Sequence, residues 1–295
     1  MRTSRGEFSR RSFLKRLGSL FVVSPLVRLP VLQENEDERI CQSTFQFAVS
    51  RSLQNEPILD VMVEVGKSFL GTPYKARTLE VAGDERLVVN LRGFDCVTYM
   101  ENALVFARLI KKWTLDFSSY KEELQYVRYR GGTVDEYPSR LHYFSDWIHD
   151  NEQKNVVVSA TELLGGIPYK KTINFMTTNR DRYRQLANDA FFETMKKIEL
   201  DLSKRTKFYI PKVHVRVAGN GIRSGDIIGI TTNIEGLDII HTGVALRMKS
   251  GALHYLHAPD VKGSVKITGR PLHEYLALHS THTGIMVARP LEPQR

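Results

Sequence analysis

Cysteine is scarce in this chain of 295 residues, which contains only Cys41 and Cys96. Two cysteines exclude a disulfide-rich scaffold. Repeats of fixed period, low-complexity tracts and internal hydrophobic runs long enough to cross a bilayer are also absent from the sequence. A hydrophobic content of 42% is sufficient for a substantial core, so we predict one elaborated folded domain.

A dense basic surface is missing too, although the formal net charge is +9. Residues 1–32 hold seven Lys and Arg but only one acidic residue, Glu7, so they account for +6 of this charge. The rest of the chain carries only +3, which is too little for the basic patch typical of nucleic-acid-binding proteins. We therefore expect no nucleic-acid partner.

The N-terminus has the pattern of an export signal. Residues 9–15 read Ser-Arg-Arg-Ser-Phe-Leu-Lys and precede a short apolar run over residues 17–27. This pattern predicts recognition by the twin-arginine translocation machinery and a location in the periplasm or cell envelope. An ordinary basic amphipathic arm is the alternative. No small-x-small cleavage site stands out before residue 33, so a cleaved leader and an uncleaved anchor both remain open.

Cys96 stands at the predicted start of a helix. Asp95 has the short acceptor side chain of a helix cap, and apolar residues follow at helical spacing over residues 97–108. A helix N-terminus carries unpaired N–H groups and a partial positive charge, so we expect the thiol pKa to fall from about 8.5 into a range of roughly 3.5–7.5. The alternative is a small buried hydrophobic residue, a common role for free cysteine.

Helical patterns come first along the chain and strand patterns come later. Apolar residues at helical spacing predict helices over residues 57–70, 116–129, 141–148 and 181–196. Short β-rich runs between Gly, Asn, Asp and Pro predict strands over residues 87–91, 208–210, 226–230, 239–247, 253–257, 265–268 and 284–289. Helices followed by antiparallel strands indicate an α+β fold class.

Most of the nine histidines lie in the β-rich last third. His241 shares a strand face with the small residues Gly243 and Ala245, which leaves room for a helix to pack beside it. His257 lies on the next predicted strand and is placed to orient His241. A nucleophile, a base and an orienting residue form the usual catalytic set, so Cys96, His241 and His257 are the candidates. A hydrogen-bonded core histidine is the alternative role for His241.

A second histidine competes for the role of base. His282-Thr283-Gly284 repeats the tripeptide His241-Thr242-Gly243. We favour His241, because a Gly-Asp strand precedes it and His257 follows within reach of a hairpin.

Five short motifs in order resemble the NlpC-type papain-fold cell-wall hydrolases. They are Gly-Thr-Pro-Tyr at 71–74, Asp-Cys at 95–96, Gly-Asp-Ile-Ile at 225–228, His-Thr-Gly-Val at 241–244 and His-Ala at 257–258. The segment 139–148 is similar to the N-acetylmuramoyl-L-alanine amidase-like branch of that superfamily. The resemblance covers roughly residues 50–292, and it implies a papain-like core in which the cysteine helix packs on an antiparallel sheet.

The resemblance also implies a reaction. Cys96 would be the nucleophile, His241 the general base and His257 the residue that orients the base. The bond cleaved would be the amide between N-acetylmuramic acid and L-alanine in muropeptides, with a leaning toward anhydro-muropeptides, and the stem peptide would be released. The Cys96 backbone N–H would stabilise the oxyanion. Such a mechanism needs no metal and no cofactor.

The chain departs from the common pattern of that superfamily in two ways. Val97-Thr98 replaces the usual Ser-Gly after the Asp-Cys pair, and about 145 residues separate Cys96 from His241. We therefore predict a mostly helical insertion over residues 113–206, placed as a wall over the cleft. With it, the predicted organisation is an export signal at 1–32, a polar linker at 33–49 and a single catalytic domain at 50–295.

Polar residues around the predicted cleft are candidates for binding substrate. A merely solvated helix face is the alternative for those in the insertion. The candidates are Tyr74, Asp95, Arg140, His142, Tyr143 and Asp146.

Three other functions remain open at this stage. A D-γ-glutamyl-diaminopimelate endopeptidase would share the chemistry and differ in the pocket. A zinc amidase is suggested by the ligand-like spacing of His254 with His257 and of His279 with His282, but alternation along a strand would place the members of each pair on opposite faces. A non-enzymatic envelope-binding domain is the third.

Overall fold

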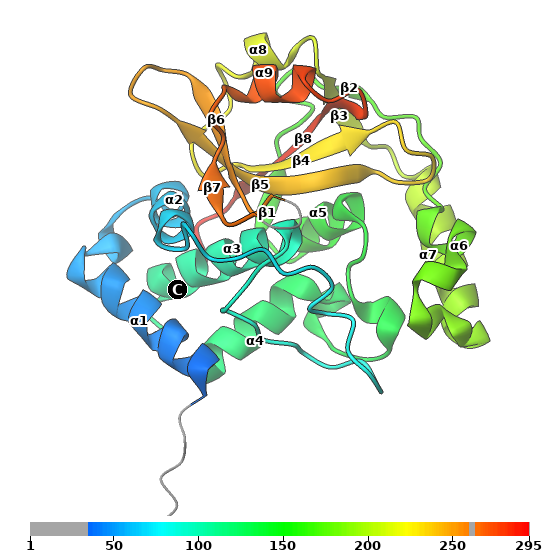
Figure 1. The fold of residues 1–295 in the computed structure, drawn as a ribbon, viewed down its shortest axis with the longest axis horizontal. Helices are drawn as coiled ribbons and strands as arrows, with labels where there is room; N and C mark the ends of the chain where they lie inside the picture. The colour runs from blue at the N-terminus through cyan, green and yellow to red at the C-terminus, as the bar shows by residue number, and fades with distance from the viewer. Residues whose placement is uncertain (1–34, 260–262, 295) are drawn as a thin grey trace, which may run out of the picture. The chain divides into compact units, whose positions relative to one another are not determined.

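A helical first half and a β-rich second half make up the protein, whose computed structural model describes residues 35–259 and 263–294 (Figure 1). The predicted export signal lies outside the described residues. The α-helices are α1 (Glu36–Ser50), α2 (Ile58–Ser68), α3 (Cys96–Lys112), α4 (Phe117–Arg128), α5 (Phe144–Gln153), α6 (Phe175–Thr178), α7 (Asp189–Lys204), α8 (Val215–Ala218) and α9 (Leu272–Ala277). None of these described helices has the length and apolar character to cross a membrane.

The strands of the described chain form one antiparallel sheet, which confirms the predicted α+β class. They are β1 (Val157–Ser159), β2 (Ile167–Pro168), β3 (Phe208–Pro211), β4 (Ile227–Thr232), β5 (Ile239–Arg247), β6 (Leu253–His257), β7 (Lys266–Ile267) and β8 (His282–Pro290). Their order is β2-β3-β8-β4-β5-β6-β7, and β1 pairs with β8 as well. The last strand in the sequence is therefore an inner strand.

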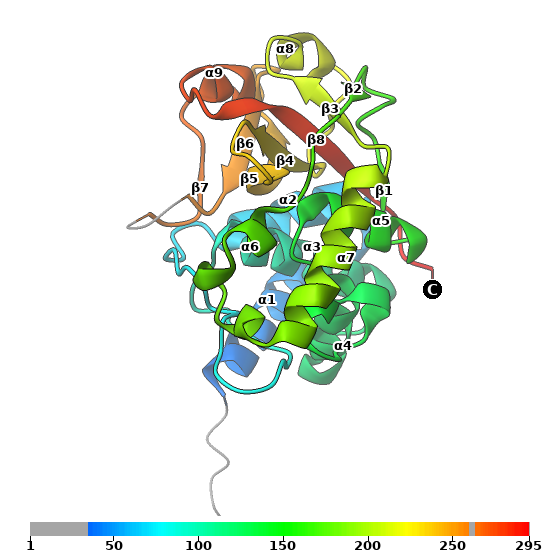
Figure 2. The same cartoon turned by 90° about the vertical axis from the view of Figure 1, so that its right-hand side faces the viewer.

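Alternation along the strands divides the core between two faces of the sheet. On β5, Val244 joins the core that contains α3, whereas Ala245 joins the core that contains residues of α8 and α9. The views in Figure 1 and Figure 2 place α8 and α9 on one side of the sheet and α2, α3 and α5 on the other. Residues 98–110 of α3 are all buried, because other helices and the sheet surround this helix.

The predicted polar linker at 33–49 is wrong, because Glu36–Ser50 forms α1. Cys41, Phe45 and Ala48 recur on one face of this helix and are buried in the main core. The three acidic residues of its first turn favour a helix N-terminus.

The predicted strand at 87–91 is also absent, because side chains rather than a neighbouring strand take up its backbone groups. The Leu91 N–H donates to the buried carboxylate of Asp37 at 2.9 Å. The Arg128 guanidinium donates to the Val88 carbonyl at 2.7 Å. This segment is therefore an extended loop that ties α1 and α4 together.

The segment 113–206 is mostly helical, as predicted, but it is built into the sheet. Its strand β1 pairs with β8, and its strand β2 pairs with β3. Helix α7 begins at Asp189 rather than near residue 181, because short 3₁₀ turns occupy residues 180–187 and Asn188 caps the helix. Helices α6 and α7 lie at one end of the domain, which Figure 2 views face on.

The C-terminal segment closes the domain against its first helices. The Glu292 carboxylate accepts a hydrogen bond of 2.8 Å from the Ile58 N–H at the start of α2. It also lies 3.6 Å from the Lys111 ammonium of α3. The end of the chain thus supplies the cap that Pro57, the N-cap residue of α2, cannot provide.

Candidate active site

Cys96 is the first residue of α3, and its position is fixed by a reciprocal cap. The Asp95 carboxylate accepts from the Thr98 N–H at 2.8 Å, and the Thr98 hydroxyl accepts from the Asp95 N–H at 3.0 Å. This capping box holds the first turn and leaves the Cys96 N–H without an intrahelical acceptor. The sequence-based prediction of a capped helix start at Cys96 is confirmed.

The predicted lowering of the thiol pKa is wrong for this structure. Burial and, to a smaller extent, the neighbouring Asp95 carboxylate raise the pKa of Cys96 to about 12. The backbone N–H groups of Thr242, Cys96 and Val97 act in the opposite direction but do not outweigh burial. The resting residue is consequently a neutral thiol, which needs a base to remove its proton.

His241 and His257 form a directly bonded pair of imidazoles. His241 Nε2 lies 2.6 Å from His257 Nδ1, and the two rings are nearly perpendicular at 82°. Burial lowers the pKa of His241 to about 4 and that of the deeply buried His257 to about 2. Both rings are therefore neutral near pH 7, and His241 is the more basic of the two.

The bond between the imidazoles determines which nitrogen of His241 is available. With His241 Nε2 engaged by His257, only Nδ1 remains to accept a proton from another group. For Nδ1 to be an acceptor, Nε2 must carry the hydrogen and donate to His257. His257 then has its own hydrogen on Nε2, which is buried without a hydrogen-bond partner among the described residues.

A β-bulge precedes His241 on its strand. Ile230 of β4 pairs with His241, but the next residue, Thr231, pairs with Ile239, so Ile240 is the extra residue. Such bulges change the direction in which a side chain points, and they are frequent beside active sites. Here the bulge lies where the start of β5 meets the first turn of α3, since the Thr242 N–H reaches the Cys96 thiol.

Cys96 and His241 line the same small cavity, which has a volume of about 120 Å³. Stacked rings of Phe144 and Trp147, with centroids 5.7 Å apart, form part of its apolar wall. The ring of Phe144 requires Gly229, because a Cβ atom there would lie 2.4 Å from Phe144 Cε1. The remaining lining residues are Val97, Met100, Leu141, His142, Leu237, Asp238, Ile239 and Ile240.

A second, more polar hollow of about 370 Å³ adjoins the first, since Val97, Leu141 and His142 line both. We call it the arginine groove. Its other lining residues are Arg77, Leu79, Glu80, Asp95, Glu101, Arg128, Arg140, Phe175, Arg182 and Tyr183.

His142 stands between the two hollows and presents one defined nitrogen. Its Nε2 lies 2.9 Å from the Tyr137 carbonyl, which can only accept, so Nε2 carries the hydrogen. Burial and the nearby Arg140 lower the pKa of His142 to about 3. His142 is therefore neutral, and its Nδ1 is an acceptor for an N–H or O–H group.

The other polar residues predicted in the insertion do not lie on one exposed helix face, because α5 begins only at Phe144. Arg140 lines the arginine groove, but it is buried and donates to Glu80 at 2.6 Å. Tyr143 donates to Glu199 at 2.6 Å, and it lines neither hollow. We assign Arg140 and Tyr143 to the support of the site.

Asp146 and Tyr74 also line neither hollow. Asp146 is buried and accepts from Arg130 at 2.5 Å and from Arg205 at 2.9 Å, which makes it the centre of an ion-pair network. Tyr74 forms a backbone bridge with Phe94, two residues before Cys96, and packs against the core. Of the predicted substrate residues, Asp95, Arg140 and His142 reach the hollows beside Cys96.

A family model described as AmiA-like, N-acetylmuramoyl-L-alanine amidase-like, matches residues 64–287. The chain belongs to this amidase-like family. The matched range contains Cys96, His241 and His257. Membership supports a hydrolase that acts on amide bonds, and it implies a peptidoglycan substrate.

Solved structures agree with the amidase-like family. An N-acetylmuramoyl-L-alanine amidase from Bacteroides uniformis is 35% identical with a TM-score of 0.74, over 79% of this chain and 99% of that chain. A Bacteroides fragilis structure provisionally named a xylanase is 36% identical with a TM-score of 0.71, over 76% and 98%. A Legionella pneumophila protein, LPG0564, shares the fold at 22% identity and a TM-score of 0.63, over 86% and 95%. No curated protein sequence matches the chain.

His282, the alternative candidate for the general base of this amidase-like protein, lies on a different strand from His241. His282 is buried on β8, which β4 separates from β5, and it does not line the cavity of Cys96. Its ring centroid is 4.4 Å from that of His279, so the prediction that strand alternation separates this pair is wrong. His279 precedes the strand and lies in the turn after α9. Within the described residues, no three His, Cys, Asp or Glu side chains gather as a metal site would require.

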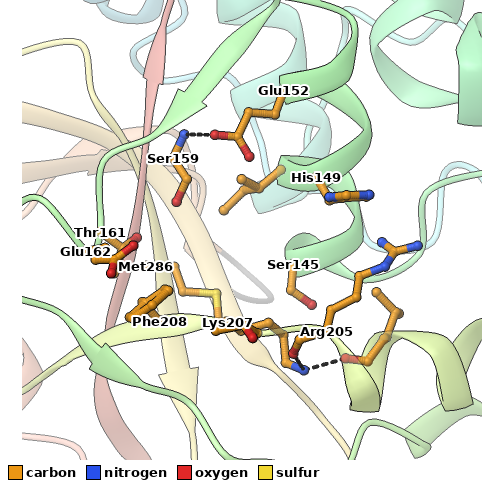
Figure 3. Close-up of a pocket in the computed structure, with 13 residues that line it drawn as sticks. Ser145, His149, Glu152, Ser159, Thr161, Glu162, Arg205, Lys207, Phe208 and Met286 are labelled. Carbon is orange, nitrogen blue, oxygen red and sulfur yellow. Dashed lines mark hydrogen bonds between the residues drawn. The ribbon is translucent and has the colours of Figure 1, made fainter.

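A larger cavity of about 480 Å³ lies on another face of α5 (Figure 3). Glu152 accepts there from the Ser159 N–H at 2.8 Å, and the Lys207 ammonium donates to the Arg205 carbonyl at 3.1 Å. Neither Cys96 nor His241 lines it, so it is separate from the candidate active site of the amidase-like fold.

Proposed function

We propose that this chain is a cysteine-dependent peptidoglycan amidase that hydrolyses the bond between N-acetylmuramic acid and L-alanine in muropeptides, including anhydro forms. One observation carries the proposal: Cys96 and His241 line one cavity, while His257 binds the far nitrogen of His241. The packing of α3 on an antiparallel sheet supports the finer proposal of an NlpC-type papain-like core.

The first half of the reaction forms a thioester. His241 Nδ1 takes the proton from the Cys96 thiol as the sulfur attacks the lactyl carbonyl carbon. The carbonyl oxygen becomes an oxyanion, and the Cys96 N–H at the start of α3 donates to it. The protonated His241 then gives its proton to the L-alanine nitrogen, the C–N bond breaks and the stem peptide leaves.

The second half releases the sugar. His241 is neutral again and takes a proton from water, whose oxygen attacks the thioester carbon. The C–S bond breaks, the proton returns to sulfur and the product is the free carboxyl group of N-acetylmuramic acid. Throughout, His257 stays neutral, because its pKa of about 2 is below that of His241, and it orients the base by accepting from His241 Nε2.

A glycosidase is the function that the name of the Bacteroides fragilis structure suggests for that protein. Glycoside hydrolysis usually relies on a pair of carboxylates that flank the scissile bond. The cavity of Cys96 has one carboxylate in its lining, Asp238, which accepts from the Ser145 N–H at 2.7 Å and the Ile239 N–H at 2.8 Å. The lining therefore favours thiol chemistry.

Replacement of the two cysteines tests the nucleophile. We expect Cys96→Ala to abolish release of stem peptide from purified muropeptides. Cys41→Ala is the matched control, since Cys41 is buried in α1 outside the cavity and its loss should leave kcat near the wild-type value. Full activity in Cys96→Ala would rule out the thiol mechanism.

Mass spectrometry of products from defined muropeptides tests the bond. The amidase yields a free sugar carboxylic acid and a peptide that begins with L-alanine. A product that begins with diaminopimelate would instead identify an endopeptidase. His241→Ala should abolish both formation and hydrolysis of the thioester, whereas His282→Ala should retain activity, because His241 lines the cavity and His282 does not.

We also propose that the pattern over residues 9–15 directs export through the twin-arginine machinery. Replacing Arg10 and Arg11 by lysine should retain the precursor in the cytoplasm. Cell fractionation measures this directly, and undiminished export of the variant would refute the proposal.

A further inference from the structure

The arginine groove lies next to the candidate nucleophile. Asp95 and Val97, on either side of Cys96 in the chain, both line it. It adjoins the cavity of Cys96, since Val97, Leu141 and His142 line both hollows. A ligand whose scissile bond lies at Cys96 and which extends past His142 therefore enters this groove.

Most charges of the arginine groove are already paired. Arg128 lies 2.7 Å from Glu101, and both side chains are only 2% exposed. Arg140 lies 2.6 Å from Glu80. The Asp95 carboxylate accepts two hydrogen bonds of the helix cap at Oδ1, from the Thr98 N–H and hydroxyl, and has no ion pair among the described residues.

Two other guanidinium groups of the groove, those of Arg77 and Arg182, differ from these paired side chains. Arg77 and Arg182 are exposed, and within residues 35–259 and 263–294 neither side chain has a hydrogen bond or an ion pair. Arg77 has a left-handed backbone with φ of 57°, a conformation that is uncommon for residues other than glycine and frequent at functional sites. Among the described residues that line this groove, the charges without an ion pair are those of these two arginines and of Asp95, so their sum is positive.

The segments that carry these two arginines are tied together. Arg184 donates to the Val81 carbonyl at 2.6 Å, and Gln185 donates to the same oxygen at 3.0 Å. Arg77 and Arg182 also both lie close enough to Tyr183 to oppose the rise in its pKa that burial causes. The two guanidinium groups therefore belong to one local surface, although 105 residues separate them in the chain.

We propose that Arg77 and Arg182 form a subsite for the carboxylates of an acidic stem peptide. This inference rests on the proposed amidase function, because it places the scissile bond at Cys96. In an N-acetylmuramoyl peptide the lactyl carboxyl group is consumed in the amide bond, so every remaining carboxylate is in the peptide. An arginine pair therefore selects the peptide and not the sugar, by charge-assisted and bidentate hydrogen bonds.

Two substrates that differ in one group test the subsite. One is an N-acetylmuramoyl-L-alanyl-γ-D-glutamyl peptide with a free α-carboxylate, and the other has an α-carboxamide at that position. We expect the double variant Arg77→Gln/Arg182→Gln to lose about 10–100-fold in kcat/KM on the acid, mainly through KM, and little on the amide. Arg216→Gln is the matched control and should change neither value, because Arg216 of α8 is exposed and has no hydrogen bond or ion pair with its side chain among the described residues.

The outcomes separate the subsite from the amidase reaction. If the double variant lost kcat/KM equally on the acid and the amide, or on neither, the subsite proposal would be wrong, and the amidase proposal would still stand. If the wild-type protein cleaved neither substrate, the amidase proposal would fail. In that case, titration calorimetry still decides the subsite. The Cys96→Ala variant should bind the acid more tightly than the amide, and this difference in affinity should vanish when Arg77 and Arg182 are also replaced by glutamine.

Discussion

Gly243 on β5 lies against His257 on β6 so closely that a Cβ atom at position 243 would be 2.9 Å from the His257 Cβ. The same atom would be 2.5 Å from the Leu256 carbonyl oxygen and 3.0 Å from Tyr255 Cζ. Cβ atoms do not approach other atoms this closely in real proteins, so the absence of a side chain at 243 allows His257 to bond His241.

Gly243→Ala should accordingly displace His257 and weaken its bond to His241. We expect kcat to fall at least about 10-fold, with a stability loss of about 1–3 kcal/mol typical of overpacking. Steady-state kinetics and thermal unfolding measure the two effects. Gly269→Ala is the control, because a Cβ atom there meets nothing within 4 Å. Similar kcat values for the two variants would contradict the positioning role of Gly243.

Asp95→Asn should make the thiol more reactive. The carboxylate raises the pKa of Cys96, whereas an asparagine amide oxygen can keep the cap without the charge. We expect several-fold faster alkylation of Cys96 by iodoacetamide at pH 8, followed by mass spectrometry. Asp116→Asn changes the equivalent cap of α4 and should leave this rate unchanged. An unaltered rate in Asp95→Asn would show that the carboxylate does not act on the thiol.

Activity should persist at a lower pH than an ordinary histidine base permits. Because the pKa of His241 is lowered to about 4, the ring is still neutral at pH 5, where a histidine with the usual pKa of about 6.5 is mostly protonated. We expect kcat/KM to decline only as the pH falls through about 4, measured by brief assays while the protein remains folded. If kcat/KM instead declined around pH 6.5, the pKa of His241 would not be lowered, and the ring would be exposed to water before the substrate binds.

Stability should fall with acidification before activity does. The folded-state pKa of His142 is about 3, so the unfolded chain takes up its proton from about pH 6.5 downward while the folded chain does not. This contribution is present above pH 6.5 and is lost as the pH falls, by roughly 1.5 kcal/mol between pH 6.5 and 5. Urea titrations measure the free energy of unfolding at pH 6.5 and 5. The difference between the two values should be smaller in His142→Gln than in the wild type, whereas His214→Gln, a change at an exposed histidine, should retain it.

Breaking the buried ion pair of Glu101 and Arg128 should lower the free energy of unfolding far more than breaking a surface pair. Glu101→Gln leaves the Arg128 charge buried, so we expect a loss of about 3–5 kcal/mol. Glu64→Gln removes a carboxylate that contacts Arg51 and Lys67 in partly exposed pairs, and it should cost less than about 1 kcal/mol. Chemical denaturation compares the two, and equal losses would contradict the argument from burial.

Local patterns predicted the parts of the site that lie on regular elements. The bounds of β5 and β6 agree with the predicted strands, and Asp95 caps α3 as expected. Alternation also placed Gly243 on the strand face of His241, whereas its contact with His257 is seen only in the structure. These features depend on neighbours within a few residues or on one hairpin.

The features of the site that the local sequence patterns did not predict depend on tertiary packing. The pKa of Cys96 depends on how completely the first turn of α3 is covered, which the helix pattern does not reveal. Asp146 was expected at the substrate, but Arg130 and Arg205 enclose it from other segments. Arg77 lies in a turn and Arg182 at the end of a short 3₁₀ helix, so only the folded chain brings them to one groove.

The inner position of β8 has a consequence for biosynthesis. This strand is the last in the chain, yet β3 and β4 both pair with it, and Glu292 beyond it caps α2. Until residues 282–290 have emerged from the ribosome, the nascent domain lacks the strand that joins the two parts of its sheet. The sheet of this domain is therefore completed only when residues 282–290 have been made, and until then β3 and β4 each lack their pairing partner β8.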